Sequence, residues 1–397
     1  MSSVTDLGWL AVPGAFDMRR DELASLLSDE PGYRTEQVWN GLWERGLLPG
    51  DMTDLPKSLR ERLRTELKPA LQEAARSVSS DGQTTKWLWQ LADGRRIETV
   101  LMLYPDRATV CVSSQAGCAM GCGFCATGQA GFDRQLSVGE IVEQVVEARR
   151  QALPRRLGNV VFMGMGEPLA NYDRTWSAVQ LLHSNLGISA RRITLSTVGV
   201  VPGIRRLATE ALPVNLAVSL HAARDELRDQ IVPLNRRYPL AVLMRACGEY
   251  LAAKGRRLSL EWALIDGVND THRDASELAE LALPLAAHVN LIPLNPTPGY
   301  ATLGARPHAV AAFRDWLRDL GVNATVRANR GTDISAACGQ LASRERSVTL
   351  RPNPTARAAH AGAAEAGSAE ASTAPASAAP ALATLNSPTG ATLSSSG

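Results

Sequence analysis

The sequence lacks several features that would assign it to other classes of protein. No run of 18 apolar residues occurs, so no transmembrane helix is predicted. The apolar residues near its start follow no basic segment and include a proline, which is untypical of a secretory signal peptide, and we expect a cytoplasmic protein. No second CxxC pair accompanies the single cysteine cluster, which disfavours a structural zinc site.

Lysine is also scarce, whereas arginine is abundant. Only four of the 42 basic residues are lysine, and arginines recur in pairs such as Arg155-Arg156. Arginine side chains suit phosphate groups and stack on bases, which favours RNA binding. A bias towards GC-rich codons accounts for the arginines equally well, and the acidic residues reduce the formal net charge to +2. Charge by itself therefore identifies no partner.

The distribution of apolar residues divides the chain into three parts. Residues 1–95 are predicted to form a small helical domain, because segments 17–27, 34–46 and 58–75 carry apolar residues at helical spacing. Residues 354–397 consist mostly of Ala, Ser, Thr, Pro and Gly. We expect them to form a disordered tail, since they cannot bury enough apolar surface to offset the entropy of folding.

Residues 96–353 are predicted to form an α/β domain, because strand-like apolar runs alternate with helical segments. The runs cover 108–114, 159–164, 192–197, 214–221, 258–265 and 288–295, with an edge strand at 323–328. Six consecutive strand–helix units favour a parallel sheet that curves into a full or partial barrel. An open doubly wound sheet is the alternative.

The stretch GCAMGCGFC, residues 117–125, follows the first of these strands and brings together Cys118, Cys122 and Cys125. Clustered cysteines in a cytoplasmic chain indicate metal or redox chemistry. Zinc with a distant fourth ligand is one interpretation. An iron–sulfur cluster with one iron open to a small molecule is favoured. Glycines let a backbone wrap closely around such a cluster, and the stretch provides Gly117, Gly121 and Gly123.

Polar or glycine-rich groups end the other predicted strands. The segment GMGEP, residues 164–168, follows the second strand, and later strands end in Ser196 with Thr197, Ser219 with His221, and Asn295. In a parallel barrel the carboxyl ends of the strands meet on one face, which carries the functional residues. The sequence therefore predicts one composite pocket with the cysteine loop at its rim.

Several motifs together resemble a known family. CAMGCGFC resembles the signature of radical S-adenosylmethionine (SAM) enzymes. The strings RATVCVSSQAGCAMGCGFCATGQAGFDRQL, VVFMGMGEPL, LAVSLHA, NLIPLNPTPG and GTDISAACGQLA resemble the bacterial radical SAM 23S ribosomal RNA (adenine-C2) methyltransferases, some of which also methylate a transfer RNA adenosine. The resemblance implies a partial (β/α)6 barrel and one 4Fe–4S cluster held by Cys118, Cys122 and Cys125. It also implies SAM as the remaining ligand of the cluster, with two SAM molecules used per turnover.

The resemblance further implies roles for individual residues. Cys338 matches a cysteine that carries a methyl group, Cys111 matches one that then forms a disulfide with it to release the product, and Glu98 matches a proton acceptor. The implied SAM contacts are Gly166, Glu167, Ser196, Ser219, Leu220 through its backbone, His221 and Asn295. From the residues alone, Cys111 and Cys247 would be buried structural cysteines, Glu98 a surface charge and His221 a core histidine.

The implied partners are 23S rRNA before ribosome assembly is complete, in some members a transfer RNA, and an electron donor such as flavodoxin or ferredoxin. A monomer is expected, and the N-terminal region resembles the family's RNA-binding accessory domain. Three other functions stay open. They are methylation of carbon 8 of adenine, as in the related antibiotic-resistance branch, zinc-stabilised RNA binding without catalysis, and radical SAM chemistry on a small molecule.

Overall fold

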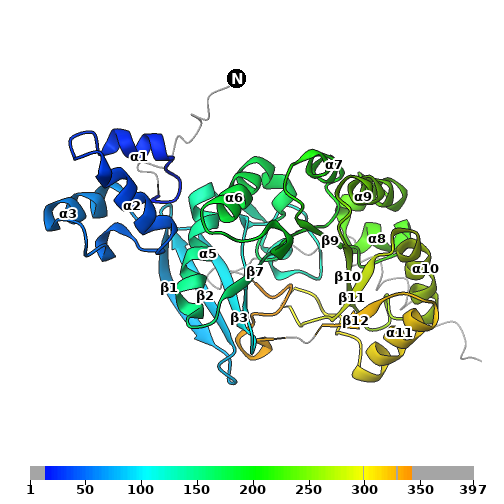
Figure 1. Ribbon diagram of the computed structural model, residues 1–397. Coiled ribbons are helices and arrows are strands. Elements are labelled where there is room, and N and C mark those ends of the chain that lie inside the picture. The colour runs from blue at the N-terminus through cyan, green and yellow to red at the C-terminus, as the bar shows by residue number, and fades with distance from the viewer. Residues whose placement is uncertain (1–13, 298, 328–329, 342–397) are drawn as a thin grey trace, which may run out of the picture. The chain divides into compact units, whose positions relative to one another are not determined.

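The computed structural model describes residues 14–297, 299–327 and 330–341, which form one large mixed sheet with helices along its outer side (Figure 1). The ten strands follow the order β1-β2-β3-β4-β7-β8-β9-β10-β11-β12. Their bounds are β1 Leu71–Val78, β2 Thr84–Leu91, β3 Arg96–Leu103, β4 Ala108–Cys111, β7 Leu157–Phe162, β8 Ile193–Thr197, β9 Asn215–Ser219, β10 Leu258–Leu264, β11 His288–Pro293 and β12 Ala324–Val326. Strands β1 to β4 pair antiparallel, and β4 with β7 to β12 pair parallel.

The predicted α/β fold is confirmed. Each strand-like run of the sequence has a counterpart among the parallel strands, from β4 to β12. The order of these strands follows the chain without a reversal, whereas a doubly wound sheet reverses at a switch point. Within the described residues β1 and β12 are the two edges, so the barrel is partial.

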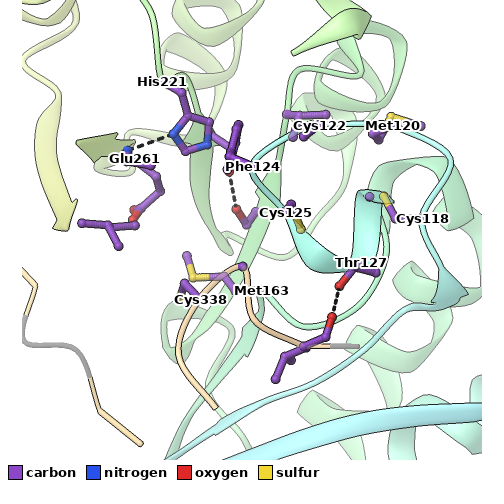
Figure 2. Close-up of a pocket in the computed structure, with 18 of the residues that line it drawn as sticks. Cys118, Met120, Cys122, Phe124, Cys125, Thr127, Met163, His221, Glu261 and Cys338 are labelled. Carbon is purple, nitrogen blue, oxygen red and sulfur yellow. Dashed lines mark hydrogen bonds between the residues drawn. The ribbon is translucent and has the colours of Figure 1, made fainter. Parts of the chain in front are cut away.

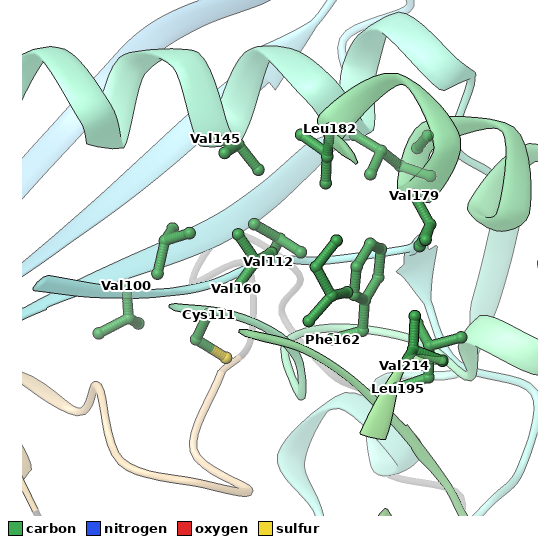
Figure 3. Packing of buried hydrophobic residues seen from close by; sticks show 14 of the residues in the cluster. Val100, Cys111, Val112, Val145, Val160, Phe162, Val179, Leu182, Leu195 and Val214 are labelled. Atoms are coloured by element: carbon green, nitrogen blue, oxygen red, sulfur yellow. The ribbon is translucent and has the colours of Figure 1, made fainter. Parts of the chain in front are cut away.

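Helices connect the parallel strands and bury their outer face. They are α5 Val138–Ala152, α6 Tyr172–Ser184, α7 Val201–Thr209, α8 Asp225–Ile231, α9 Leu240–Lys254, α10 His272–Ala282 and α11 Pro307–Asp319. Figure 3 shows Val145 of α5 and Leu182 of α6 above the sheet that carries Val160 and Phe162. These four side chains are almost fully buried, so this layer is the hydrophobic core that fixes the strand ends in space.

The prediction that residues up to 95 are mostly helical is wrong for the stretch from 71 to 91. Helix α3, Lys57–Glu66, ends before Pro69, and the predicted continuation to residue 75 instead forms the start of β1. Two Asp-Gly turns, at Gly82 and Gly94, then fold β1, β2 and β3 into an antiparallel meander, and both glycines have positive φ. The predicted domain boundary at residue 95 falls inside this meander.

Three helices precede the meander, as predicted: α1 Arg20–Leu26, α2 Tyr33–Trp43 and α3. Trp43 is buried and meets the ring of Phe16 edge-on at 5.3 Å, and Trp39 is partly buried beside it. The tryptophans of α2 therefore serve the core of this region, as their helical spacing indicates.

A buried carboxylate joins helix α5 to the beginning of the meander. The two carboxylate oxygens of Glu143 accept hydrogen bonds from the backbone N–H groups of Ala70 and Leu71, at 2.8 and 3.1 Å. Burial raises the pKa of Glu143 to about 8. The neutral acid is therefore the form that the fold favours at neutral pH.

We expect this carboxyl group to make the protein less stable as the pH rises. Its pKa is higher in the folded chain than the ordinary value of 4.5, so its stabilisation is complete below about pH 4.5 and is lost as the pH approaches 8, at no more than about 1.4 kcal/mol per pH unit. Urea unfolding of Glu143→Gln between pH 5 and 9 should show a smaller fall in the free energy of unfolding than the parent. Glu280→Gln, an exposed residue of α10 (His272–Ala282), is the control and should keep the parent's slope.

Among the described residues, no helix combines the length and apolar character that crossing a membrane requires. The predicted tail, 354–397, lies outside the described residues.

Candidate active site

The inner face of the sheet opens into a pocket at the carboxyl ends of the parallel strands, where the sequence predicted one (Figure 2). All three clustered cysteines line it. Eight residues from the segments at the strand ends line it as well: Gly164, Gly166, Glu167, Ser196, Thr197, Ser219, His221 and Asn295. Cys338 also lines it, although it lies more than 200 positions after the clustered cysteines in the sequence. The predicted composite pocket is therefore present.

The cysteine loop is closed at its base by a small two-stranded sheet. Strand β5, Gln115–Gly117, pairs antiparallel with β6, Phe132–Gln135, and the backbone N–H of Cys118 donates to the carbonyl of Gly131 at 2.7 Å. Gly117 has φ 76°, and a Cβ there would lie 2.1 Å from that carbonyl oxygen, so only glycine fits. Gly121 also has positive φ, but Gly123 does not, so the expected need for glycine holds at two of the three positions.

The donor set of the loop fits an iron–sulfur cluster. Cys118, Cys122 and Cys125 are free thiols, and burial raises the pKa of each of them, that of Cys118 to about 12. Thiolates in such a site need a cationic partner, which the irons of a cluster provide. Among the described residues, no three His, Cys, Asp or Glu side chains converge on a single-ion site.

Gly166 and Glu167 close the pocket beside the loop. Gly166 has φ 98°, and a Cβ there would lie 2.8 Å from the backbone nitrogen of Gln115. The Glu167 carboxylate accepts from the backbone N–H groups of Leu169 and Val198, at 3.0 and 2.9 Å, and so ties β8 to the segment after β7. Burial raises the pKa of Glu167 to about 7.

The strand-end residues differ in how they face the pocket. The hydroxyl oxygens of Ser196 and Ser219 lie 3.5 Å apart on neighbouring strands, and both residues line the pocket. Leu220 does not line it. Its backbone N–H donates to the Glu261 carbonyl and its own carbonyl accepts from Arg228, so both groups already have protein partners. The predicted backbone contact of Leu220 with SAM has no support here.

His221 is neutral rather than charged, and its ring accepts a hydrogen bond. Burial lowers its pKa to about 3, and its backbone is held at φ 61°. The Ala263 N–H donates to Nδ1 at 3.0 Å, and the Asn269 amide donates to the His221 carbonyl at 2.8 Å. Because Nδ1 accepts, the ring proton is on Nε2. His221 is thus both a buried histidine, as its position alone suggests, and part of the pocket wall.

Residues 331–341, which we call the carrier segment, bring Cys338 to the cysteine loop. The Ala126 N–H donates to the Gly339 carbonyl at 2.8 Å, and the Thr127 hydroxyl donates to the Leu341 carbonyl at 2.6 Å. Asn295 donates to the carbonyl of Cys338 itself, at 3.2 Å. The predicted SAM contact Asn295 therefore also fixes the backbone of the predicted methyl carrier.

A second pocket lies on the other side of Cys338. Its lining includes Val100, Met102, Tyr104, Cys111, Met163, Arg327, Arg330 and Cys338. Cys111 is on β4 and is only 6% exposed, yet its side chain points to the opposite side of the sheet from Val145 and Leu182 (Figure 3). Burial raises the pKa of Cys111 to about 12. Both cysteines are free, so the predicted disulfide between them is not formed in this structure.

Glu98 is buried, which excludes the surface-charge interpretation. Its side chain is 3% exposed, and Oε1 lies 3.1 Å from the Nζ of Lys86 on the neighbouring strand. The Ser113 hydroxyl donates to the Glu98 carbonyl at 2.6 Å. Glu98 does not line either pocket, but it lies two positions before Val100 on the same face of β3.

Arg228, which no sequence motif singled out, holds the ends of strands β8 and β9. This arginine of α8 is 1% exposed and donates to the carbonyls of Val198, Ser219 and Leu220 and to the amide oxygen of Asn235. A guanidinium group with five donors can hold several strand ends at once, which a shorter side chain cannot. Nothing in the sequence separates it from the many other arginines.

Comparisons with known proteins agree with this site. The Radical SAM superfamily matches residues 112–281. A probable dual-specificity RNA methyltransferase RlmN from Parafrankia sp. is 51% identical, over 82% of this chain and 90% of that protein. The dual-specificity RNA methyltransferase RlmN 1 of Myxococcus xanthus is 49% identical, over 86% and 97%. The crystal structure of a radical SAM methyltransferase from Sphaerobacter thermophilus has a TM-score of 0.79 and 49% identity, over 83% and 98%. The chain is thus an enzyme of the radical SAM superfamily and belongs, within it, to the RlmN family of methyltransferases.

Proposed function

We propose that this enzyme methylates carbon 2 of a specific adenosine in 23S rRNA, and an adenosine of transfer RNA as a second substrate. The observation that carries the proposal is the place of Cys338. It lies between a pocket lined by the three clustered cysteines and a second pocket lined by Cys111. A methyl group carried on this sulfur would be within reach of both.

The electronic character of carbon 2 explains why such an arrangement is needed. This carbon lies between two ring nitrogens and is electron-poor, so it does not attack the methyl group of SAM as a nucleophile. When bound, the 4Fe–4S cluster and SAM supply the methyl group and a radical that removes hydrogen. We assign the cluster to Cys118, Cys122 and Cys125, and SAM to the pocket walls at Gly166, Glu167, Ser196, Ser219, His221 and Asn295.

The chain itself supplies three groups to the reaction. Cys338 accepts the methyl group on its sulfur and later bonds through the methylene carbon to the base. Glu98 takes the proton that carbon 2 loses. The adduct also gives up one electron, which returns to the redox couple that supplied one electron for the cleavage of SAM. Cys111 then forms a disulfide with Cys338: the bond between the Cys338 sulfur and the methylene carbon breaks, and that carbon takes up the proton of the Cys111 thiol and becomes the methyl group of the product. Because burial raises the pKa of Cys111 to about 12, this thiol is neutral at rest and does not compete for the first methyl group.

The second pocket is where we place the adenine ring. The target base has to leave its stack to reach a buried reaction centre. Tyr104 offers an aromatic ring at this pocket, with the guanidinium groups of Arg107 and Arg330 at 4.7 and 4.4 Å from the ring centre. Aromatic and arginine side chains are the usual platform for unstacked bases and their phosphates.

Other partners follow from the same proposal. Residues 1–95, which include helices α1 to α3 and strands β1 and β2 of the meander, act as an RNA-binding accessory domain. An electron donor such as flavodoxin or ferredoxin reduces the cluster. The enzyme acts in the cytoplasm, as a monomer, on rRNA before ribosome assembly is complete.

The test is anaerobic reconstitution with iron and sulfide, followed by reaction with SAM, a reductant and rRNA or tRNA, and mass spectrometry of the released nucleosides. We expect 2-methyladenosine in RNA. Only 8-methyladenosine would transfer the enzyme to the carbon-8 branch. A protein that binds RNA and zinc, takes up no iron and methylates nothing would contradict the proposal.

A further inference from the structure

Lys86, on strand β2 of the meander, contacts both Glu98, the proposed proton acceptor, and the carrier segment that holds Cys338. The Nζ of Lys86 lies 3.1 Å from Oε1 of Glu98 and donates to the carbonyl of Ser335, in the carrier segment, at 3.1 Å. Lys86 is opposite Val100 in the β2–β3 ladder, and Val100 is opposite Cys111 in the β3–β4 ladder. Residues opposite one another share a face, so these three form a row on the inner side of the sheet.

Two more contacts hold the carrier segment on the hairpin of β1 and β2. The Ser80 N–H donates to the carboxylate of Asp333 at 2.8 Å. Gly331, with φ 64°, lies so close to Thr84 that a Cβ would come within 2.9 Å of the threonine methyl group. The far end of the segment is bonded to the cysteine loop through Gly339 and Leu341. The carrier segment that contains Cys338 is therefore bonded to the β1–β2 hairpin at one end and to the cysteine loop at the other.

We propose that Lys86 is a positioning residue that aligns Glu98 with Cys338. Its ammonium group lies against a carboxylate that is almost fully buried, compensates for the loss of water around it and orients its oxygens. Through Ser335 the same group fixes the start of the carrier segment. The inference rests on the proposed function, because it takes the roles of Glu98 and Cys338 from there.

Three substitutions separate charge from hydrogen bonding. Lys86→Arg keeps both, Lys86→Gln keeps donors without the charge, and Lys86→Met removes both. We expect Lys86→Arg to stay within about threefold of the parent in RNA methylation, and the other two to fall at least about tenfold. In Lys86→Gln, methylation of Cys338 and cleavage of SAM should continue, so a covalent protein–RNA adduct should accumulate because its proton is not removed.

Asp333→Ala tests the holding of the segment alone. It releases the Ser80 contact without changing the charge pair, and should slow methylation of Cys338, measured by the mass of the intact protein, without accumulation of adduct. Lys86→Met should show the same slower methylation, whereas Lys86→Gln should not. Arg273→Gln, an exposed arginine on α10, is the control for loss of one positive charge and should behave as the parent.

The inference is overturned if Lys86→Gln, folded with an unchanged melting temperature, turns over like the parent and accumulates no adduct. It is also overturned if Lys86→Arg is as inactive as Lys86→Met while both remain folded. If the parent enzyme itself produces no methylated adenosine, the proposed function fails instead. The rate of Cys338 methylation in Lys86→Met then still decides whether Lys86 holds the carrier segment.

Discussion

Replacing Cys338 with alanine should abolish methylation of RNA while SAM is still cleaved reductively. Among the described residues, two side chains that contain sulfur line both pockets: the thiol of Cys338 and the thioether of Met163. Of these two, only Cys338 has a thiol that can accept a methyl group, and it is not one of the three clustered cysteines. Alanine keeps the backbone bonds of the carrier segment, because Asn295 and Ala126 bond to carbonyls there. We expect a loss of at least about 1000-fold, as for removal of a covalent nucleophile.

Two measurements on the same samples check this expectation. Nucleoside analysis should find no methylated adenosine, and chromatography should still find 5′-deoxyadenosine. Cys247→Ala is the matched control, because Cys247 is buried in α9 and lines neither pocket. Residual methylation by Cys338→Ala above about one part in 1000 would remove the cysteine from the reaction.

Replacing Cys111 with alanine should stop the reaction one step later and leave the enzyme bonded to RNA. Cys111 and Cys338 line one pocket, and Cys111 approaches it from the sheet while Cys338 approaches it from the carrier segment. Without the second sulfur no disulfide forms, so the bond between Cys338 and the methylene carbon of the base persists. Turnover should end after one equivalent, and the protein should migrate on a denaturing gel with a nuclease-sensitive shift.

The double substitution of Cys111 and Cys338 supplies the control for this trapping. It should show no shift, because the sulfur that bonds to the base is absent. Normal multiple turnover by Cys111→Ala would exclude the disulfide step. A shift that survives in the double variant would show that another side chain bonds to the RNA.

Much of the fold could be predicted from the sequence because the parallel strands of the barrel are mainly apolar and well covered. Strands β7 (LGNVVF), β10 (LSLEWAL) and β11 (HVNLIP) have no exposed residue, and apolar side chains make up most of their buried positions. The meander was missed for a different reason. Strand β1, LQEAARSV, is exposed at six of its eight residues, so it shows no alternation of buried and exposed side chains, and its mixed polar composition resembles that of a helix. The Asp-Gly turns at Gly82 and Gly94 were the available signal.

The candidate site likewise has one part that could be predicted from the sequence and another that could not. Residues at strand ends and in the cysteine loop follow from topology, since parallel strands present their carboxyl ends on one face. The side chains that hold these residues in place cannot be predicted from topology. Lys86 contacts Glu98 across a strand pair and Ser335 from 249 positions away in the sequence, and Arg228 reaches the ends of two strands, β8 and β9, from a helix. Contacts of this kind depend on tertiary packing, and no local pattern encodes them.

The hydrogen bonds that anchor the carrier segment determine which movements can redirect the sulfur of Cys338. Its backbone is tied at Cys338 itself and at Gly339, so the sulfur can pass from one pocket to the other by rotation about its own χ1 bond, without a displacement of the loop. Rotations of this kind take picoseconds to nanoseconds, whereas loop motions take nanoseconds to microseconds and opening of lids takes longer still. On the proposed function, the sulfur that carries the methyl group would therefore change its direction without waiting for the loop to move.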